Sequence, residues 1–366
     1  MPIYMDRHDI TNNVTAAQVA EMHQQDLKIQ DQFGCRGLTY WFDAKRNTAF
    51  CLIEAPDMPA ITAMHNYSHG KVPNHVIEVN PALVESFLGR IEDPEKTGDG
   101  NLNIIDESAF RIIMLVSLMP PPGQRTTDHV DRLGRLNETI HNIVRSSGGK
   151  LIRPNAHRLV ISFSSVGNAV RSAFEIHSQF GKSRTSPGDG FSLKIGVSAG
   201  EPVTDKPAFF EDAVRLAERM CRIVKGEIIL SSEVRDEYDS EKPSFLPSQK
   251  NAYCLSMVDQ QFLTSLMDFF ESSWKNADFK IGDFEKPVGC SKSQFYRKMI
   301  ALTGKSPNSF LMEYRLNEAL SLLSKQARNV SEVAFETGFN SPSYFSKCFQ
   351  RQFGRLPSDY LAALAD

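Results

Sequence analysis

The sequence lacks long apolar runs, paired cysteines and any excess of positive charge, and each absence excludes a class of protein. No apolar stretch of the 366-residue chain approaches the length of a membrane span, and the first residues lack a charged-then-apolar targeting pattern. The six cysteines are scattered without a Cys-x-x-Cys pair, so we expect reduced, buried thiols. These absences predict a cytoplasmic protein with no membrane partner.

The net charge of −3 excludes a protein that binds nucleic acid through a global positive field. Any DNA affinity must therefore come from local cationic faces. The length and the 41% of hydrophobic residues allow two or three domains with real cores. Two charged stretches rich in turn formers, Glu92–Asn101 and Asp239–Lys250, read as linkers. They predict domains at residues 1–92, 108–238 and 259–366.

Near the C-terminal end, residues 329–349 read as two short helices joined at a glycine-containing turn, which is a helix-turn-helix. Ser341 can cap the second helix, and Pro342 suits its first position. Helical spacing puts an apolar set on one face of that helix, Phe345, Phe349 and Phe353. The opposite face carries a polar, cationic set suited to base edges and phosphates, Ser343, Lys347 and Arg351.

A related unit lies upstream, at residues 281–304, where a capping serine begins a helix and Gly304 ends it. Its inward residues are Phe295, Met299 and Leu302, and its outward residues are Ser293, Tyr296 and Arg297. The apolar periodicity of residues 310–323 predicts one helix that connects the two units. Two DNA-binding units joined by one rigid helix suit two successive major grooves of double-stranded DNA.

Together with the closing residues 349–360, this arrangement resembles the AraC/XylS family of transcription regulators over about the last hundred residues. The resemblance implies that six residues lie at or near positions that contact DNA: Ser293, Tyr296, Arg297, Ser343, Lys347 and Arg351. The alternative is that these residues are only the solvated faces of a helical bundle.

The first segment alternates strands and helices in the order βαββαβ. We expect strands or helices at residues 3–8, 15–34, 38–42, 49–53, 57–70 and 75–79. This order predicts a ferredoxin-like domain, in which two helices cover one face of a small sheet.

Histidines are concentrated in this segment. His65 and His69 are four residues apart on the second helix, so both imidazoles project from one face, and His75 follows beyond the next turn. Neutral imidazoles at this spacing can share nickel, zinc or copper, and His23 with Asp26 can add ligands from the first helix. The alternative is that these histidines lie on the surface or pack in the core.

Four stretches, residues 20–26, 40–42, 50–56 and 65–70, look like a family of small bacterial nickel-binding proteins that dimerise through a ferredoxin-like sheet. The resemblance covers about residues 1–90. It implies that nickel or another divalent transition metal binds here, without fixing which histidines are the ligands.

The middle segment again mixes strands and helices. We expect them at residues 111–116, 127–146, 150–163, 166–180 and 193–200, followed by a helix that runs through Arg219 and a strand at residues 227–231. The order of elements, with the stretches 195–201 and 226–231, resembles the class III nucleotidyl cyclase domain. Members of that family hold two metal ions with two carboxylates.

The expected carboxylates are missing from this sequence. Val116-Ser117-Leu118 stands where the family has its first aspartate, and Ala156-His157 stands where it has a Gly-Asp pair. The family also has an asparagine and an arginine that act on the transition state, both on one helix. Arg215 and Arg219 can fill the arginine position here, but the asparagine is absent. We therefore expect a degenerate cyclase-like domain that dimerises or binds a small ligand.

These interpretations combine into a multidomain α+β protein: a ferredoxin-like sensor, a cyclase-like α/β domain and an all-α double helix-turn-helix. The function predicted is a homodimeric, sequence-specific transcription regulator controlled by a metal or small-molecule effector, and not an enzyme. A nucleotidyl cyclase with a DNA-binding tail and a metal-buffering protein remain alternatives. The operator, the sign of regulation and the effector stay open.

Overall fold

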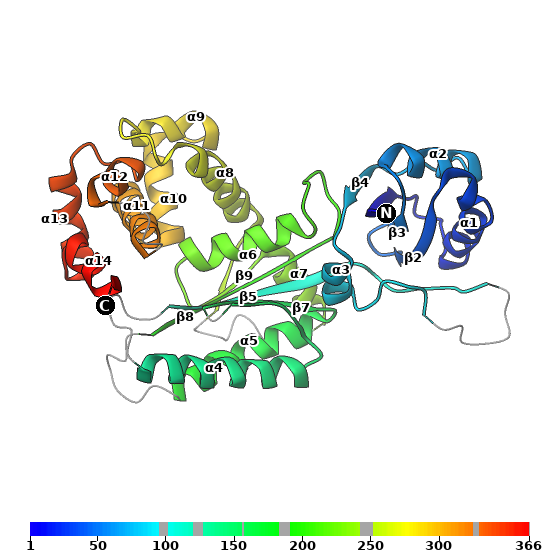
Figure 1. Ribbon diagram of the computed structural model, residues 1–366, viewed down its shortest axis with the longest axis horizontal. Coiled ribbons are helices and arrows are strands. Elements are labelled where there is room, and N and C mark those ends of the chain that lie inside the picture. Colours follow the sequence, from blue (N-terminus) through cyan, green and yellow to red (C-terminus); the bar gives the residue numbers. More distant parts are fainter. Residues whose placement is uncertain are drawn as a thin grey trace.

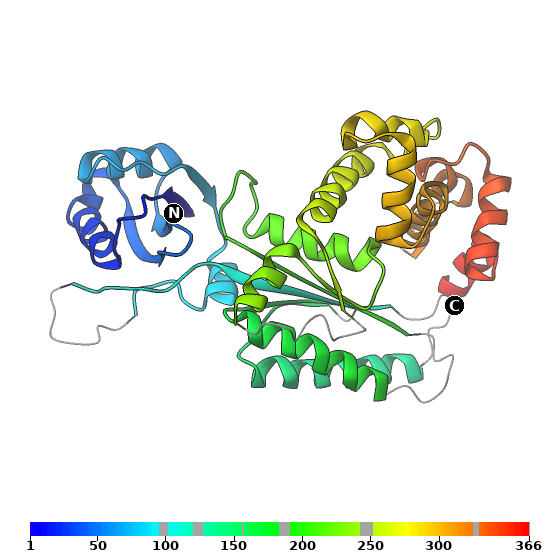
Figure 2. The same ribbon diagram turned by 180° about the vertical axis from the view of Figure 1, so that it is seen from behind.

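The computed structural model describes residues 1–94, 102–119, 127–155, 157–182, 191–241, 252–324 and 329–365. A small sheet with two helices, a larger sheet and a group of helices follow one another along the chain (Figure 1). Seen from behind, the first sheet and the C-terminal helices lie at opposite ends of the molecule, with the larger sheet between them (Figure 2). No helix in the described part of the chain is both long and apolar enough to cross a membrane.

The first part of the chain forms a four-stranded antiparallel sheet in the order β2-β3-β1-β4. Its elements are β1 (Ile3–Asp9), α1 (Ala16–Ile29), η1 (Gln30–Phe33), β2 (Arg36–Asp43), β3 (Thr48–Glu54), α2 (Met58–Ser68) and β4 (His75–Glu78). This is the ferredoxin-like arrangement predicted from the order of elements. Thr15 and Gln18 form a capping box at the start of α1, and Gly34 ends η1 in the left-handed conformation.

The larger sheet has the strand order β10-β9-β8-β5-β7-β6. Its elements are β5 (Arg111–Met119), α4 (Thr127–Ser146), β6 (Lys150–Asn155), β7 (Arg158–Phe163), α5 (Val166–Lys182), β8 (Ser192–Gly200), α6 (Glu211–Ile223), β9 (Ile228–Leu230), α7 (Ser232–Glu241) and β10 (Ala252–Cys254). The four strands β8-β5-β7-β6 repeat the order of the first sheet. Helices α4 and α5 cover one face, and α6 lies on the other (Figure 1). The likeness to cyclases stays a prediction.

Several elements were not predicted from the sequence, among them α3 (Pro81–Leu88), α7 and β10. Helix α3 packs on β6 and β7, where it buries Val84, Phe87 and Leu88. Strand β10 has only three residues and pairs with β9. This strand therefore depends on a distant partner rather than on local pattern.

The C-terminal part is entirely helical. Its elements are α8 (Met257–Ser273), η3 (Ile281–Phe284), α9 (Glu285–Val288), α10 (Lys292–Thr303), α11 (Pro307–Ser324), α12 (Val330–Glu336), α13 (Pro342–Phe353) and α14 (Pro357–Ala365). The predicted helix-turn-helix is α12 followed by α13, and α11 is the predicted connecting helix. Phe345 and Phe349 are buried against Leu316, Ala319 and Leu323 of α11.

Residues 91–94 and 102–110 connect the two sheets and pack along β2. The Asp93 amide donates to the Leu38 carbonyl at 3.1 Å, and the Phe42 amide donates to the Glu107 carbonyl at 3.0 Å. The Tyr40 hydroxyl donates to the Asn103 carbonyl at 3.0 Å. The start of the first predicted linker and the segment after it are therefore fixed to the first sheet, while residues 95–101 lie outside the described part.

Gly338 lies in the turn between α12 and α13, where its φ of 79° is left-handed. A Cβ there would lie 2.8 Å from Arg315 Nε and 2.9 Å from the Trp274 carbonyl oxygen. Arg315 is buried and donates to the carbonyls of Trp274 and Asn276 at 2.9 and 2.7 Å. The turn is therefore packed against the end of α8.

We predict that Gly338→Ala lowers the free energy of unfolding by more than Gly354→Ala does. Gly354 has a similar φ of 77°, but a Cβ there meets nothing within 4 Å. The control should therefore cost only backbone strain of about 1–2 kcal/mol, while Gly338→Ala adds a clash with Arg315. Urea unfolding followed by circular dichroism measures both. Equal midpoints for the two variants would show that the close packing at Gly338 does not contribute.

Candidate functional site

A buried network of histidines and aspartates lies between the first sheet and its two helices. His65 of α2 is at its centre: its Nε2 lies 2.9 Å from Asp6 Oδ2 on β1, and its Nδ1 lies 3.1 Å from Asp26 Oδ2 on α1. His69, which caps α2, places Nε2 3.3 Å from both His65 Nδ1 and Asp26 Oδ2. The network therefore ties three elements of the first domain together.

The charges of this network depend on one another. Burial raises the pKa of Asp6, but the charge of His8 and the hydrogen bond to His65 outweigh burial and hold that pKa well below its ordinary value. The pKa of Asp26 is also held low, because its hydrogen bonds to His65 and His69 outweigh burial. Burial lowers the pKa of His65, but its bonds to Asp26 and Asp6 raise it to about 10. Two carboxylates therefore concentrate negative charge around one imidazole, as a bound cation requires.

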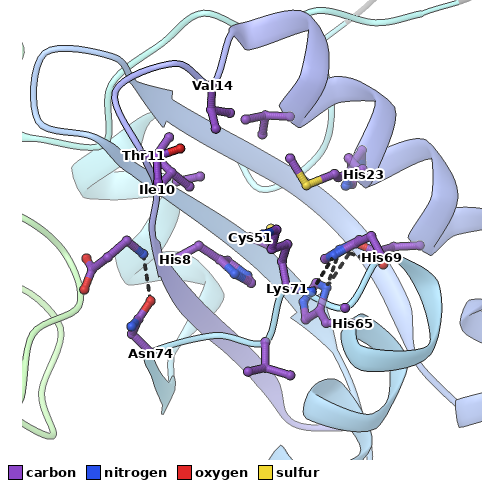
Figure 3. A pocket seen from close by; sticks show the side chains of 17 residues that line it. His8, Ile10, Thr11, Val14, His23, Cys51, His65, His69, Lys71 and Asn74 are labelled. Carbon is purple, nitrogen blue, oxygen red and sulfur yellow. Dashed lines mark hydrogen bonds and ion pairs between the residues drawn. The ribbon is translucent and has the colours of Figure 1, made fainter.

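Three buried polar atoms beside this network have no hydrogen bond among the described residues: His8 Nε2, His23 Nε2 and Asp26 Oδ1. His8 and His23 have ionic partners nearby: Asp6 Oδ1 lies 3.4 Å from His8 Nε2, and Asp93 Oδ2 lies 3.5 Å from His23 Nε2. All three residues line a pocket of about 340 Å³ (Figure 3). Buried polar atoms without a hydrogen bond cost free energy, so they indicate a polar ligand.

Two groups of side chains place their ligand atoms within 4.8 Å of one another. One is Asp26, His65 and His69, and the other is Asp6, His8, Cys51 and His65. Imidazole and carboxylate donors suit nickel, zinc, cobalt or copper. All three residues of the first group line the pocket, whereas Asp6 of the second group does not. The first group therefore fits a transition metal better.

The structure brings together only some of the predicted metal ligands. His65 and His69 meet at Asp26, and His23 lines the same pocket. His75 is exposed on β4 and lies opposite Arg7 of β1, so it projects from the other face of the sheet than Asp6 and His8. Asp6, His8 and Cys51 were missed, although Asp6 and His8 alternate along a strand whose buried face is otherwise apolar.

The six predicted DNA-contacting residues are all exposed. Ser293, Tyr296 and Arg297 lie on α10, behind a capping box formed by Ser291 and Gln294. Ser343, Lys347 and Arg351 lie on α13, whose first turn is capped by Ser341. Within the described residues, none of the three cations forms a salt bridge. Both helices therefore present free polar faces over buried apolar ones.

The arginines at the cyclase-like position serve a different purpose. Arg219 of α6 is buried, and its Nη2 lies 2.7 Å from Asp268 and 2.8 Å from Glu271, both on α8. Arg215 pairs with Glu211 of its own helix. Ser117, where the family has an aspartate, is buried in β5, and Ala156 lies outside the described residues. Arg219 thus bridges the larger sheet to the helical domain.

Comparison with known protein families gives two matches. Residues 4–79 match the family described as "Nickel responsive protein SCO4226-like", and residues 286–363 match a helix-turn-helix domain family. The chain has an SCO4226-like N-terminal domain and an AraC-type C-terminal domain.

Individual relatives cover less than a third of the chain each. Histidine kinase P4 of Formosa agariphila is 37% identical over 29% of this chain and 8% of its own length. The HTH-type transcriptional regulator ExsA of Pseudomonas aeruginosa is 30% identical over 28% of this chain and 37% of its own length. The crystal structure of SCO4226 from Streptomyces coelicolor is 27% identical, with a TM-score of 0.20, and covers 21% of this chain and 94% of that one. The chain thus spans less than half the length of these two curated relatives.

Proposed function

We propose that this chain is a sequence-specific DNA-binding transcription regulator whose first domain holds a transition metal and controls the helix-turn-helix domain. One observation carries the proposal: the capped helices α10 and α13 each present an exposed cationic face. Helix α11 connects the two. The match to a helix-turn-helix family and the transcriptional regulators among the relatives support it. The homodimer stays a prediction.

Asp26, His65 and His69 would hold the metal. A bound cation would supply a cross-link between α1 and α2, and the SCO4226-like match supports nickel as the first candidate. The Lys71 amide donates to His69 Nδ1 at 3.1 Å, which keeps the ring proton on Nε2. If Nε2 were the ligand atom, the ring proton would have to lie on Nδ1, which could then no longer accept the hydrogen bond from the Lys71 amide.

Breaking the Lys71 hydrogen bond would act on β1. The segment that follows holds that strand through Asn74: its amide donates to the Arg7 carbonyl at 2.8 Å, and its Oδ1 accepts from the Asp9 amide at 2.7 Å. Arg7 faces the larger sheet, where its Nη1 lies 2.7 Å from Glu201 Oε2 and 3.2 Å from the Val203 carbonyl. We infer that Arg7 transmits the state of the site.

The loop that Arg7 contacts leads into α6, and α6 contacts the DNA-binding domain at several points. Arg219 pairs with α8, and Arg222 pairs with Glu318 of α11 and lies 3.8 Å from the centre of the Tyr314 ring. Just beyond α6, the Lys225 amide donates to the Leu302 carbonyl of α10 at 2.9 Å. A movement of α6 would therefore change how α10 is held.

The contacts of Arg219 favour a regulator over a cyclase with a DNA-binding tail. An arginine that neutralises a triphosphate must be free to meet it, but Arg219 is held by two carboxylates. We propose that the middle domain transmits rather than catalyses. A metal-buffering role would leave the contacts from Arg7 to Leu302 without a purpose.

We predict that Arg297→Ala and Lys347→Ala each weaken binding to a specific DNA site by about 1–3 kcal/mol, because each removes a contact to a base edge. The site is selected from random DNA with the wild-type protein, and affinity is measured by fluorescence anisotropy. Lys182→Ala, an exposed cation of the middle domain, is the matched control. Unchanged affinity in both reader variants would contradict the assignment.

We predict that nickel changes the affinity for this DNA about 5–150-fold in wild type, the range of typical allosteric coupling, and does not change it in His65→Ala/His69→Ala. The reason is that this variant loses two of the three ligands. His75→Ala removes an exposed histidine of the same domain and should behave as wild type. If nickel binds to wild type with no effect on the DNA titration, the first domain does not control the reader through this metal.

We predict that Arg7→Met leaves nickel affinity intact but removes most of the effect of nickel on DNA affinity. Methionine keeps the apolar stem but cannot bind Glu201 or the Val203 carbonyl. Arg36→Met, which breaks an ion pair with Glu54 at the surface of the same sheet, should keep the coupling. Calorimetry with nickel and anisotropy with DNA measure the two quantities separately. Full coupling in Arg7→Met would rule out this route.

A further inference from the structure

We propose that the pocket beside the metal group binds a small amphipathic molecule, with a bidentate chelating head and a hydrocarbon body, together with the metal. This inference depends on the proposed metal site at Asp26, His65 and His69. It goes further by assigning the effector to a chemical class: an organic ligand that binds together with the metal.

The size of the pocket exceeds what a metal ion needs. Its volume of about 340 Å³ lies at the lower end of the range typical of small-molecule sites. A water molecule occupies about 30 Å³ in the liquid, so an ion with the waters that complete its coordination would leave part of the space unfilled. The remaining space is sized for a compact organic ligand.

His65 and His69 lie at one side of the pocket, Ile10, Thr11 and Val14 lie at the other, and His8 is between them (Figure 3). Six residues form the apolar part of the wall: Ile10, Val14, Val19, Met22, Ala49 and Val72. Apolar surface of this extent gains free energy only when it is covered, so it favours a hydrocarbon body.

The polar region calls for a chelating head. Three protein ligands would leave coordination positions open on an ion in the tetragonal geometry that nickel adopts with nitrogen and oxygen donors. His8 Nε2 and His23 Nε2 also face this pocket, are buried and have no hydrogen bond among the described residues. A head with two adjacent oxygen donors can fill two metal positions and reach these imidazoles. Hydroxamates and α-hydroxy acids have such heads.

The class of ligand is tested with a homologous series. Full-length protein without an affinity tag is saturated with nickel and titrated in a calorimeter with acetohydroxamate, butanohydroxamate and hexanohydroxamate. We expect the affinity to rise about fourfold per added methylene, as hydrocarbon leaves water for the apolar wall. Titration of the same compounds into nickel alone gives the intrinsic chelation, which should not follow this trend. Omission of nickel should abolish binding.

Val72→Ser is the matched variant, because Val72 is 47% exposed at the pocket and the change should not disturb folding. Serine removes apolar surface without adding a charge, so this variant should keep the nickel affinity and flatten the dependence on chain length. Val14→Ser, on the opposite wall, is a second variant with the same expectation. Nickel binding with equal affinity for all three hydroxamates would overturn this inference and leave the proposed function standing. Absence of nickel binding would overturn both.

Discussion

The buried pairing of His65 with Asp6 and Asp26 is the interaction on which the proposed control depends. These three residues come from a helix, a strand and another helix, so they fix how α1 and α2 lie on the sheet. Ionised groups at this depth are stable only as a complete set, because loss of one partner leaves an uncompensated charge in a medium of low polarity. A metal that replaces the imidazole proton would therefore change a structural link as well as fill a site.

Strand β1 connects the candidate site to the larger sheet. Asp6 and His8 face the helices, while Arg7 between them faces the larger sheet, since side chains alternate along a strand. The same strand thus contacts the candidate site on one face and Glu201 on the other. Beyond Glu201, helix α6 contacts α8 and α11 through Arg219 and Arg222, and Lys225, just after this helix, contacts α10. Arg219 thus joins the larger sheet to the helical domain.

Much of the fold could be predicted because its signals are local. Thr15, Ser291 and Ser341 begin helices with side-chain caps, and Gly34, Gly304 and Gly354 end them in the left-handed conformation. Such signals occupy a few neighbouring residues. Strand β10 escaped prediction because it is defined by its pairing with a distant strand, whereas α3 carries local signals that were missed, the Asn80 cap and the left-handed Gly89.

The predicted part of the candidate site lies on two helices: His65 and His69 come from α2, and His23 and Asp26 come from α1. His65 and His69 are four apart on α2, so their meeting follows from helical geometry. Asp6, His8 and Cys51 join them through the pairing of β1 with β3, and no local spacing reveals that register. His75 illustrates the converse: it is near in sequence, but its register opposite Arg7 turns it to the other face.

The central claim is that metal binding in the first domain changes the DNA-binding domain. Hydrogen exchange with and without nickel tests it most directly. In the full-length protein, nickel should alter exchange in residues 70–74 and also at the Lys225 amide and in α8, which hold the DNA-binding domain. The His65→Ala/His69→Ala variant should show neither change. A nickel effect confined to the first domain would contradict the account.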